Sequence, residues 1–274
     1  MKKESCIIRF LYRTCIGRAI LKIIICPKFS KIVSHYLNSS FSKWLIKRYI
    51  KKYNMNMDEY ETVEYTSFNN FFIRCRKNNF FDEEPENLIS PCDGYLSVYK
   101  IDSDCNLKIK HSDYTIQSLL QDEILSKKYQ NGICMVFRLE PHNYHRYIYI
   151  DNCTVEKEVR IAGVLHCVRP VACEKFPVYV ENSREYALLN TEHFGSIIQM
   201  EIGALLVGKI KNYHDLNNVS RGQEKGYFEF GGSTIVLLFE KDMIIPNDDI
   251  IRNTEFGIET PVKAGTQVGV SKLK

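Results

Sequence analysis

Residues 226–239 read GYFEFGGSTIVLLF, and this stretch decides how the carboxyl-terminal half is interpreted. The continuous apolar run from Ile235 to Phe239 predicts a buried strand. The two glycines before Ser233 permit backbone conformations and close approaches that other residues forbid. A Gly-Gly turn at the entry to a strand is the simple interpretation. The functional interpretation is a serine hydroxyl next to an exposed backbone carbonyl.

Short runs typical of β-strands, broken by Gly, Pro, Asn and Asp, fill the chain from Ile89 onward. The expected strands cover residues 95–101, 106–109, 133–139, 147–150, 155–162, 186–190, 195–207, 227–230 and 235–239, and residues 116–125 predict one helix. The pattern of β-strand and turn residues at 258–269 is similar to that of barrel-sandwich hybrid proteins. The predicted fold class is therefore α+β, with a mainly β, barrel-sandwich-hybrid-like core after an N-terminal helical region. A short aromatic helix is expected after Ser67.

Residues 1–52, called the basic arm below, carry 13 Lys and Arg against one acid, Glu4. Helical patterning over residues 6–25 and 28–52, separated by Pro27, predicts two helices. Isoleucines between the charges favour an anionic membrane surface over nucleic acid as the partner. Basic residues at intervals of four or five between residues 9 and 22 argue against a membrane-spanning helix. A basic region packed on its own body is the alternative.

The overall composition is that of an ordinary globular protein, with 45% hydrophobic and 26% charged residues in 274. It excludes a disordered or collagenous chain. The ten cysteines include no CxxC pair and are interpreted as reduced thiols. No metal site is expected, because the nearest approach to zinc-ligand spacing is Cys167 and Cys173 beside His166.

Two further segments carry side chains that catalysis uses. The turn at residues 90–94, SPCDG, places the carboxylate of Asp93 just before a strand, and residues 141–147, PHNYHRY, place His145 after another. Serine, histidine and aspartate can act as nucleophile, base and orienting group. Each alone also has a structural explanation, because Asp-Gly is a common turn and a lone histidine is commonly a packing residue.

In this order the segments resemble phosphatidylserine decarboxylase proenzymes, from about Phe68 to Lys274. The landmarks that carry the resemblance are FFIR at 71–74, PCDG at 91–94, YHR at 144–146, Asn182-x-Arg184, Thr191 with Phe194-Gly195, IGAxxVG at 202–208, KGYF at 225–228 and GGST at 231–234. Members of this family commonly carry a membrane-associating N-terminal region. The resemblance therefore divides the chain into a membrane-associating region at 1–66 and a catalytic domain at 67–274.

The resemblance implies a self-processing enzyme. Ser233 would attack the Gly232 carbonyl, and the resulting ester would leave a pyruvoyl group at position 233. The chain would become a beta chain, 1–232, and an alpha chain, 233–274. The pyruvoyl group would form a Schiff base with the amine of phosphatidylserine and accept the electrons freed as CO2 leaves, giving phosphatidylethanolamine.

The same resemblance suggests roles for individual residues. His145 is the expected base and Asp93 its orienting group. Asn182 and Arg184 are candidates for binding a substrate phosphate or carboxylate, with a buried structural pair as the alternative. Many members read Tyr-His-Arg-x-His, whereas this chain has Ile148 in place of the second histidine. An isoleucine cannot transfer protons, so His145 must cover that role.

The expected partners are an anionic phospholipid membrane and phosphatidylserine, with the alpha and beta chains remaining associated and a homodimer left open. The expected location is the cytoplasmic side of the cell membrane, as a peripheral protein. One alternative is a soluble amino-acid decarboxylase of the same plan. Another is an uncleaved, noncatalytic lipid-binding homologue, which Ile148 brings into consideration. A serine hydrolase is disfavoured, because Ile235 stands where a nucleophile elbow needs glycine.

Overall fold

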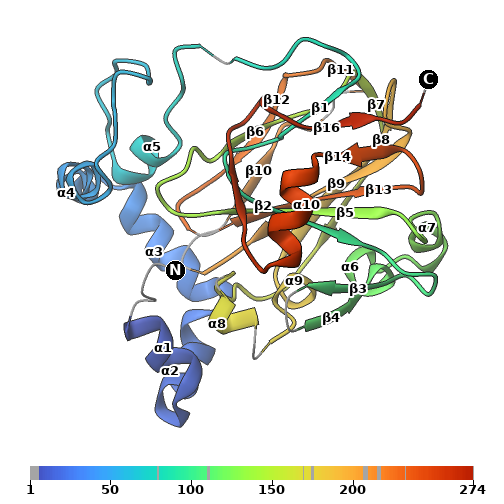
Figure 1. The fold of residues 1–274 in the computed structure, drawn as a ribbon. Helices are drawn as coiled ribbons and strands as arrows, with labels where there is room; N and C mark the ends of the chain where they lie inside the picture. The colour runs from blue at the N-terminus through green and yellow to red at the C-terminus, as the bar shows by residue number, and fades with distance from the viewer. Residues whose placement is uncertain are drawn as a thin grey trace.

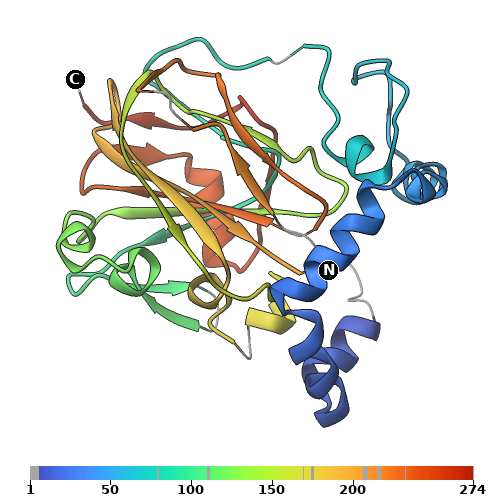
Figure 2. The ribbon, with the colours of Figure 1, turned by 180° about the vertical axis from the view of Figure 1, so that it is seen from behind.

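The computed structural model describes residues 6–78, 80–109, 112–168, 170–173, 176–205, 209–214, 217–231 and 233–273. Helices predominate up to residue 53 and strands in the remainder, as Figure 1 shows. The predicted α+β class with a mainly β body is therefore confirmed. In both views the N-terminal helices lie along one side of the β body, and the C-terminus lies at the opposite side (Figures 1 and 2).

The basic arm folds into four α-helices where the sequence predicted two. They are α1 (Cys6–Arg13), α2 (Cys15–Ile24), α3 (Pro27–Asn38) and α4 (Trp44–Tyr53), with a 3₁₀ turn at Ser40–Ser42. Thr14 separates the first two helices, because its side chain caps α2 by accepting the N–H of Gly17. In the described part of the chain, no helix is long and apolar enough to cross a membrane.

The basic arm packs against the body along its length, and two of these contacts position the site. Near its start, Tyr12 is fully buried, and its hydroxyl accepts the backbone N–H of Cys167 at 2.8 Å. Further along, Leu37 of α3 packs in one cluster with Phe68 and Phe71 of α5 (Phe68–Phe72). The predicted start of α5 is confirmed, since the Ser67 side chain accepts an N–H of its first turn.

Eight antiparallel strands form the large sheet, in the order β11-β7-β8-β9-β13-β5-β2-β15. Their bounds are β2 (Gly94–Lys100), β5 (Ile133–Leu139), β7 (Cys153–Ile161), β8 (Arg184–Thr191), β9 (Ser196–Gly203), β11 (Asn218–Val219), β13 (Ser233–Phe239) and β15 (Thr260–Val262). The apolar run predicted as a buried strand is β13, which lies between β9 and β5. Residues 206–207 of one expected strand lie outside the described residues.

Alternation of side chains along β13 places a hydrophobic core on each face of the large sheet. Val236 and Leu238 belong to one core, and Ile235 and Leu237 belong to the other. Ser233 has the same parity as Ile235, so its side chain lies on the face of the second core. That core also contains residues of β6 and β12, two strands of a smaller sheet.

Two smaller three-stranded sheets and a hairpin complete the β body. Their strands are β1 (Asn87–Ile89), β16 (Gln267–Ser271) and β14 (Ile244–Pro246); β10 (Ile210–Asn212), β12 (Glu224–Phe228) and β6 (Arg146–Ile148); and β3 (Asn106–Ile109) with β4 (Ser112–Thr115). Among the described strands none closes a barrel, so the predicted barrel-sandwich-hybrid-like core is corrected to packed open sheets. Residues 258–269 do not form the predicted hybrid architecture, because β15 joins the large sheet and β16 joins a smaller one.

In the described part of the body, five short helices follow α5. They are α6 (Ile116–Leu120), α7 (Glu123–Lys127), α8 (Pro170–Cys173), α9 (Val178–Glu181) and α10 (Asp248–Glu255). The single helix expected at 116–125 is split at Gln121, which adopts a left-handed conformation with φ of 53°. Helix α10 was not predicted, because Ile250 is its one buried residue and a helical apolar stripe is therefore weak.

Candidate active site

Ser233 is the first residue of β13 and lies inside the large sheet. Its backbone pairs with Leu139 on β5 and with Gly203 on β9. The side chain is fully buried, and its Oγ has no hydrogen-bond partner among the described residues. Gly232, the predicted point of attack, lies outside the described residues. A buried hydroxyl without a partner costs about 1–3 kcal/mol, so this Oγ contributes nothing to stability through hydrogen bonds to the described residues.

His145 lies immediately before β6 and is buried. Its Nδ1 is 2.9 Å from the carbonyl oxygen of Asn143. A carbonyl oxygen can only accept, so Nδ1 carries the proton and Nε2 keeps a free lone pair in the neutral ring. Within the described residues this Nε2 has no partner. Burial and the nearby Arg74 charge lower the pKa of His145 to about 3, so the ring is neutral at pH 7.

The ring of Phe72 on α5 links His145 to the segment that enters β13. Its centroid is 4.2 Å from that of His145 and 5.1 Å from that of Phe230. The backbone N–H of Phe230 also donates to the side-chain oxygen of Asn69 at 3.0 Å. Helix α5 therefore holds both the candidate base and the residues that precede Ser233. Sequence reasoning noted the aromatic motif of α5 but missed its role and that of Asn69.

Asp93 makes other contacts than the predicted one with His145. Its Oδ2 is 2.7 Å from Nη2 of Arg76, and its Oδ1 accepts the backbone N–H of Ala264 at 3.0 Å. Within the described residues no hydrogen bond joins Asp93 to His145, whose Nδ1 is held by the Asn143 carbonyl. The orienting role of Asp93 therefore stays a prediction that these contacts do not support. Asp93 ties the turn at residues 90–94 to a residue after Ser233.

Asn182 and Arg184 are buried and bonded to the backbone. The Asn182 side chain accepts the N–H of His166 and donates to the carbonyl oxygens of His166 and Gly203. The Arg184 guanidinium donates to four backbone carbonyl oxygens, at 2.6 to 3.1 Å, which belong to Ser118, Leu119, Val180 and Asn182. This geometry favours the structural alternative for both residues over substrate binding.

The sequence model of the phosphatidylserine decarboxylase family matches residues 68–270. The chain belongs to the phosphatidylserine decarboxylase family. It is 47% identical over 265 residues to phosphatidylserine decarboxylase proenzyme 2 of Clostridium acetobutylicum, covering 96% of this chain and 91% of that protein. It is 39% identical over 273 residues to the proenzyme of Clostridium novyi, covering 96% and 92%.

Ile148, where many members of the phosphatidylserine decarboxylase family carry a second histidine, lies near the partners of Asp93. It lines a small pocket together with Arg76 and Ala264, the two residues that bind the Asp93 carboxylate. The departure from the family motif therefore falls beside Asp93, in a place where Arg76 already neutralises the carboxylate. His145 is linked to the segment that enters β13 through the ring of Phe72.

A pocket of about 170 Å³ with mainly apolar walls adjoins the same segment. It is lined by Phe230 and Gly231, by Leu139 and by Ile8 of α1. Leu139 is the β5 partner of Ser233, so the pocket lies at the end of the sheet where β13 begins. The basic arm thus contributes one wall of a pocket that Phe230 and Gly231 also line.

In the described residues no cluster of three His, Cys, Asp or Glu side chains could hold a metal ion.

A buried ion pair lies close to β13 and was missed by sequence reasoning. The Nζ of Lys225 is 2.6 Å from Oε2 of Glu201, and both side chains are completely buried. Glu201 stands opposite Ile235 in the β9–β13 pairing, and Asn212 also donates to its carboxylate at 3.1 Å. Lys225 belongs to the KGYF landmark, but its partner lies 24 residues away on another sheet. No local sequence signal joins the two.

Proposed function

We propose that this chain is a self-processing decarboxylase that converts phosphatidylserine to phosphatidylethanolamine and CO2. The observation that supports it most directly is the fully buried, unpaired Oγ of Ser233 at the family's Gly-Gly-Ser-Thr position. Relatives that are 47% and 39% identical to this chain carry the name phosphatidylserine decarboxylase proenzyme. A proenzyme that cuts itself needs an internal nucleophile, and Ser233 would supply one.

Self-processing begins when the Oγ of Ser233 attacks the carbonyl carbon of Gly232. The peptide bond becomes an ester, and the Ser233 nitrogen leaves as an amine after gaining the proton that Oγ loses. The Ser233 α-proton is then removed, and the Gly232 carboxylate departs. The dehydroalanine left at 233 gains water and releases ammonia, which leaves a pyruvoyl group. The products are chains 1–232 and 233–274.

His145 moves the proton in the first step. Its Nε2 lone pair is free, because Nδ1 is committed to the Asn143 carbonyl. The same burial that keeps the ring neutral makes an imidazolium costly, so the proton passes on to the Ser233 nitrogen as the peptide bond breaks. A positioned base of this kind contributes about 10²–10⁴-fold to a rate.

The surroundings of Ser233 fit a covalent pyruvoyl group. The Ser233 side chain whose α-carbon would become the ketone carbon is buried, and the adjoining pocket has mainly apolar walls. The pyruvoyl group supplies an electron-accepting carbonyl for the substrate amine, so that the carboxylate can leave as CO2. The pocket walls exclude water from this chemistry, and Phe72 keeps His145 beside the segment at 230–231.

The basic arm, within the region at 1–66, places the catalytic domain at 67–274 on an anionic membrane. Large apolar side chains are exposed along the arm at Ile7, Phe10, Ile16, Ile20, Ile23, Ile32, Tyr36, Phe41 and Trp44. Its cations add about 1 kcal/mol each near an anionic leaflet, which favours the cytoplasmic side of the cell membrane. Ile8 of α1 lines the pocket beside Gly231, whereas the neighbouring Ile7 is exposed. Helix α1 therefore connects the surface proposed to bind the membrane with the pocket proposed to bind the substrate.

Carbon dioxide release tests the substrate. We expect matured protein to release CO2 much faster from phosphatidylserine in mixed micelles than from free serine, and Ser233→Ala to release none from either. Faster release from free serine would favour the soluble amino-acid decarboxylase. An uncut wild-type chain that binds vesicles and releases no CO2 would favour the noncatalytic lipid-binding homologue and contradict the proposal.

A further inference from the structure

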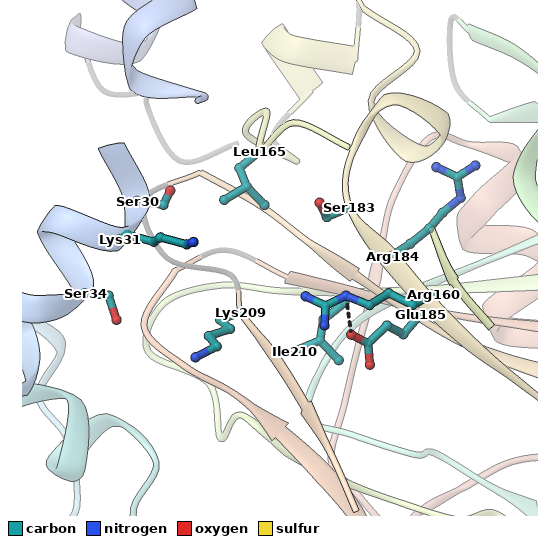
Figure 3. Close-up of a pocket in the computed structure, with 10 residues that line it drawn as sticks. All are labelled: Ser30, Lys31, Ser34, Arg160, Leu165, Ser183, Arg184, Glu185, Lys209 and Ile210. Carbon is teal, nitrogen blue, oxygen red and sulfur yellow. Dashed lines mark ion pairs between the residues drawn. The ribbon is translucent and has the colours of Figure 1, made fainter. Parts of the chain in front are cut away.

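A second pocket, of about 240 Å³, lies between α3 and the strands β7, β8 and β10 (Figure 3). The residues that line it share no member with the lining of the pocket beside Gly231, and they include neither His145 nor Ser233. The decarboxylation proposed above makes no use of it.

Three cationic residues from separate elements line this pocket. Lys31 comes from α3, Arg160 from β7 and Lys209 from the residue before β10. Figure 3 shows Lys31 and Arg160 extending toward the space between α3 and the sheet from opposite sides. Among the described residues, neither lysine ammonium has a hydrogen-bond or ion-pair partner. Arg160 pairs through Nε with Glu185 at 3.3 Å, which leaves the other guanidinium nitrogens free to donate.

The wall of the pocket adds a further uncompensated charge. Arg184 is almost fully buried, and its guanidinium points away from Lys31 and Arg160 toward backbone carbonyl oxygens (Figure 3). No carboxylate pairs with it in the described part of the chain. The residues that line the pocket include one carboxylate, Glu185, which pairs with Arg160. The lining therefore carries more positive than negative charge.

A buried hydroxyl in the same pocket lacks a partner. Ser30 is 7% exposed, and its Oγ forms no hydrogen bond among the described residues. By contrast, the Ser183 hydroxyl on the opposite wall donates to the carbonyl oxygen of Gly163 at 2.9 Å. A buried unpaired hydroxyl beside unpaired cations is the donor set that an oxyanion satisfies.

One end of the pocket is unsuited to an anion. The Ser34 hydroxyl lies 3.5 Å from Oε2 of Glu229, a carboxylate that would repel negative charge there. An anion is therefore expected between Lys31 and Arg160, next to Ser30.

We propose that this pocket binds a phosphate group, carried by the headgroup of an anionic phospholipid or present as free phosphate. Phosphate matches two point charges and a guanidinium fork better than a carboxylate does, because it offers more acceptor oxygens. The headgroup is the favoured source, because Ile32, the residue after Lys31, is 70% exposed and stands on the arm's apolar surface. A lipid held here would anchor α3 at the membrane.

Binding measured by calorimetry tests the site without reference to catalysis. The probes are inorganic phosphate and dihexanoyl phosphatidylglycerol below its micelle concentration, with wild-type protein, Lys31→Gln/Lys209→Gln and the matched control Lys28→Gln/Lys211→Gln. Lys28 shares α3 and Lys211 shares β10, but neither lines the pocket. We expect the pocket variant to weaken binding of at least one probe about tenfold or more, and the control to change it less than about twofold.

The two probes also identify the source of the phosphate. Tighter binding of the short-chain lipid indicates a headgroup site, and tighter binding of inorganic phosphate indicates a free-anion site. Equal weakening in the pocket variant and the control would show that a diffuse positive field acts, which overturns the proposal. Absence of binding of either probe to the wild-type protein overturns it as well.

Discussion

The carboxylate of Asp93 accepts the backbone N–H of Ala264 at 3.0 Å, and this bond joins two segments that cleavage before Ser233 would separate. The other carboxylate oxygen is held by Arg76 at 2.7 Å. Because β13 lies between β5 and β9, the segment after Ser233 is already part of the large sheet. We therefore propose that the two chains remain together after processing.

Replacing Asp93 by Asn should weaken the association of the two chains. The Asp93 and Arg76 side chains are 11% and 15% exposed, so their pairing is poorly screened. We expect the loss of that charge to lower the free energy of releasing chain 233–274 in urea by about 1–3 kcal/mol. The matched control is Asp249→Asn, because Asp249 pairs with Arg252 at the exposed surface and such pairs contribute about 0–1 kcal/mol.

The same variant separates the two roles considered for Asp93. Since no hydrogen bond joins it to His145 among the described residues, Asp93→Asn should mature nearly as fast as the wild type, whereas His145→Ala should mature far more slowly. Maturation blocked equally in both variants would restore Asp93 as the group that acts on the base.

Acid should destabilise the folded chain through its buried histidines. The pKa of His145 is lowered to about 3 and that of His166 to about 4, both chiefly by burial. Below about pH 6.5 the unfolded chain therefore binds more protons than the folded chain. As the pH is lowered, the free energy of unfolding decreases by up to about 1.4 kcal/mol per pH unit for each histidine. Urea unfolding of uncut Ser233→Ala at pH 7, 6 and 5 measures this slope.

Adding His145→Asn to that protein should reduce the slope by about one histidine's share. Adding His35→Asn, at an exposed position on α3, should leave it unchanged. If the slope does not change with His145→Asn, then His145 is not held neutral by the fold.

Membrane binding should depend on the apolar surface of the basic arm. Ile16 on α2 is 70% exposed, and Ile124 on α7, outside the arm, is 83% exposed. Inserting an isoleucine side chain into a membrane is worth about 1.5–3 kcal/mol, so Ile16→Ser should weaken vesicle binding about tenfold or more. Ile124→Ser should have no effect. Sedimentation with anionic vesicles measures both, and equal weakening by the two variants would exclude the arm as the docking surface.

The parts of the fold that the sequence predicted well depend on local patterns. The apolar run after Ser233 has the signature of a buried central strand, and β13 is one. Ser67 before an aromatic segment gave the start of α5. The number of arm helices was wrong because each predicted helix is interrupted within an apolar pattern that continues on both sides, the first at Thr14 and the second at the 3₁₀ turn Ser40–Ser42. Helix α10 was missed because a helix that buries one side chain has little periodicity to detect.

The candidate site was only partly predictable, because its residues meet through contacts distant in sequence. Ser233 and His145 were found from the motifs that contain them. Arg76 forms an ion pair with Asp93, which is 17 residues away in the sequence, and Glu201 pairs with Lys225 on another sheet. Such partners depend on strand register, which the sequence pattern alone does not give.

The mass of the purified chain over time tests the central claim, that Ser233 cuts the chain and provides the reactive group. We expect the wild-type protein to convert from one 32.0 kDa chain into two chains, 1–232 and 233–274, the second with a blocked N-terminus. Ser233→Ala should remain a single chain, because it has no hydroxyl to attack Gly232. Cleavage of Ser233→Ala at the same bond, or a wild-type protein that decarboxylates phosphatidylserine while uncut, would contradict the account.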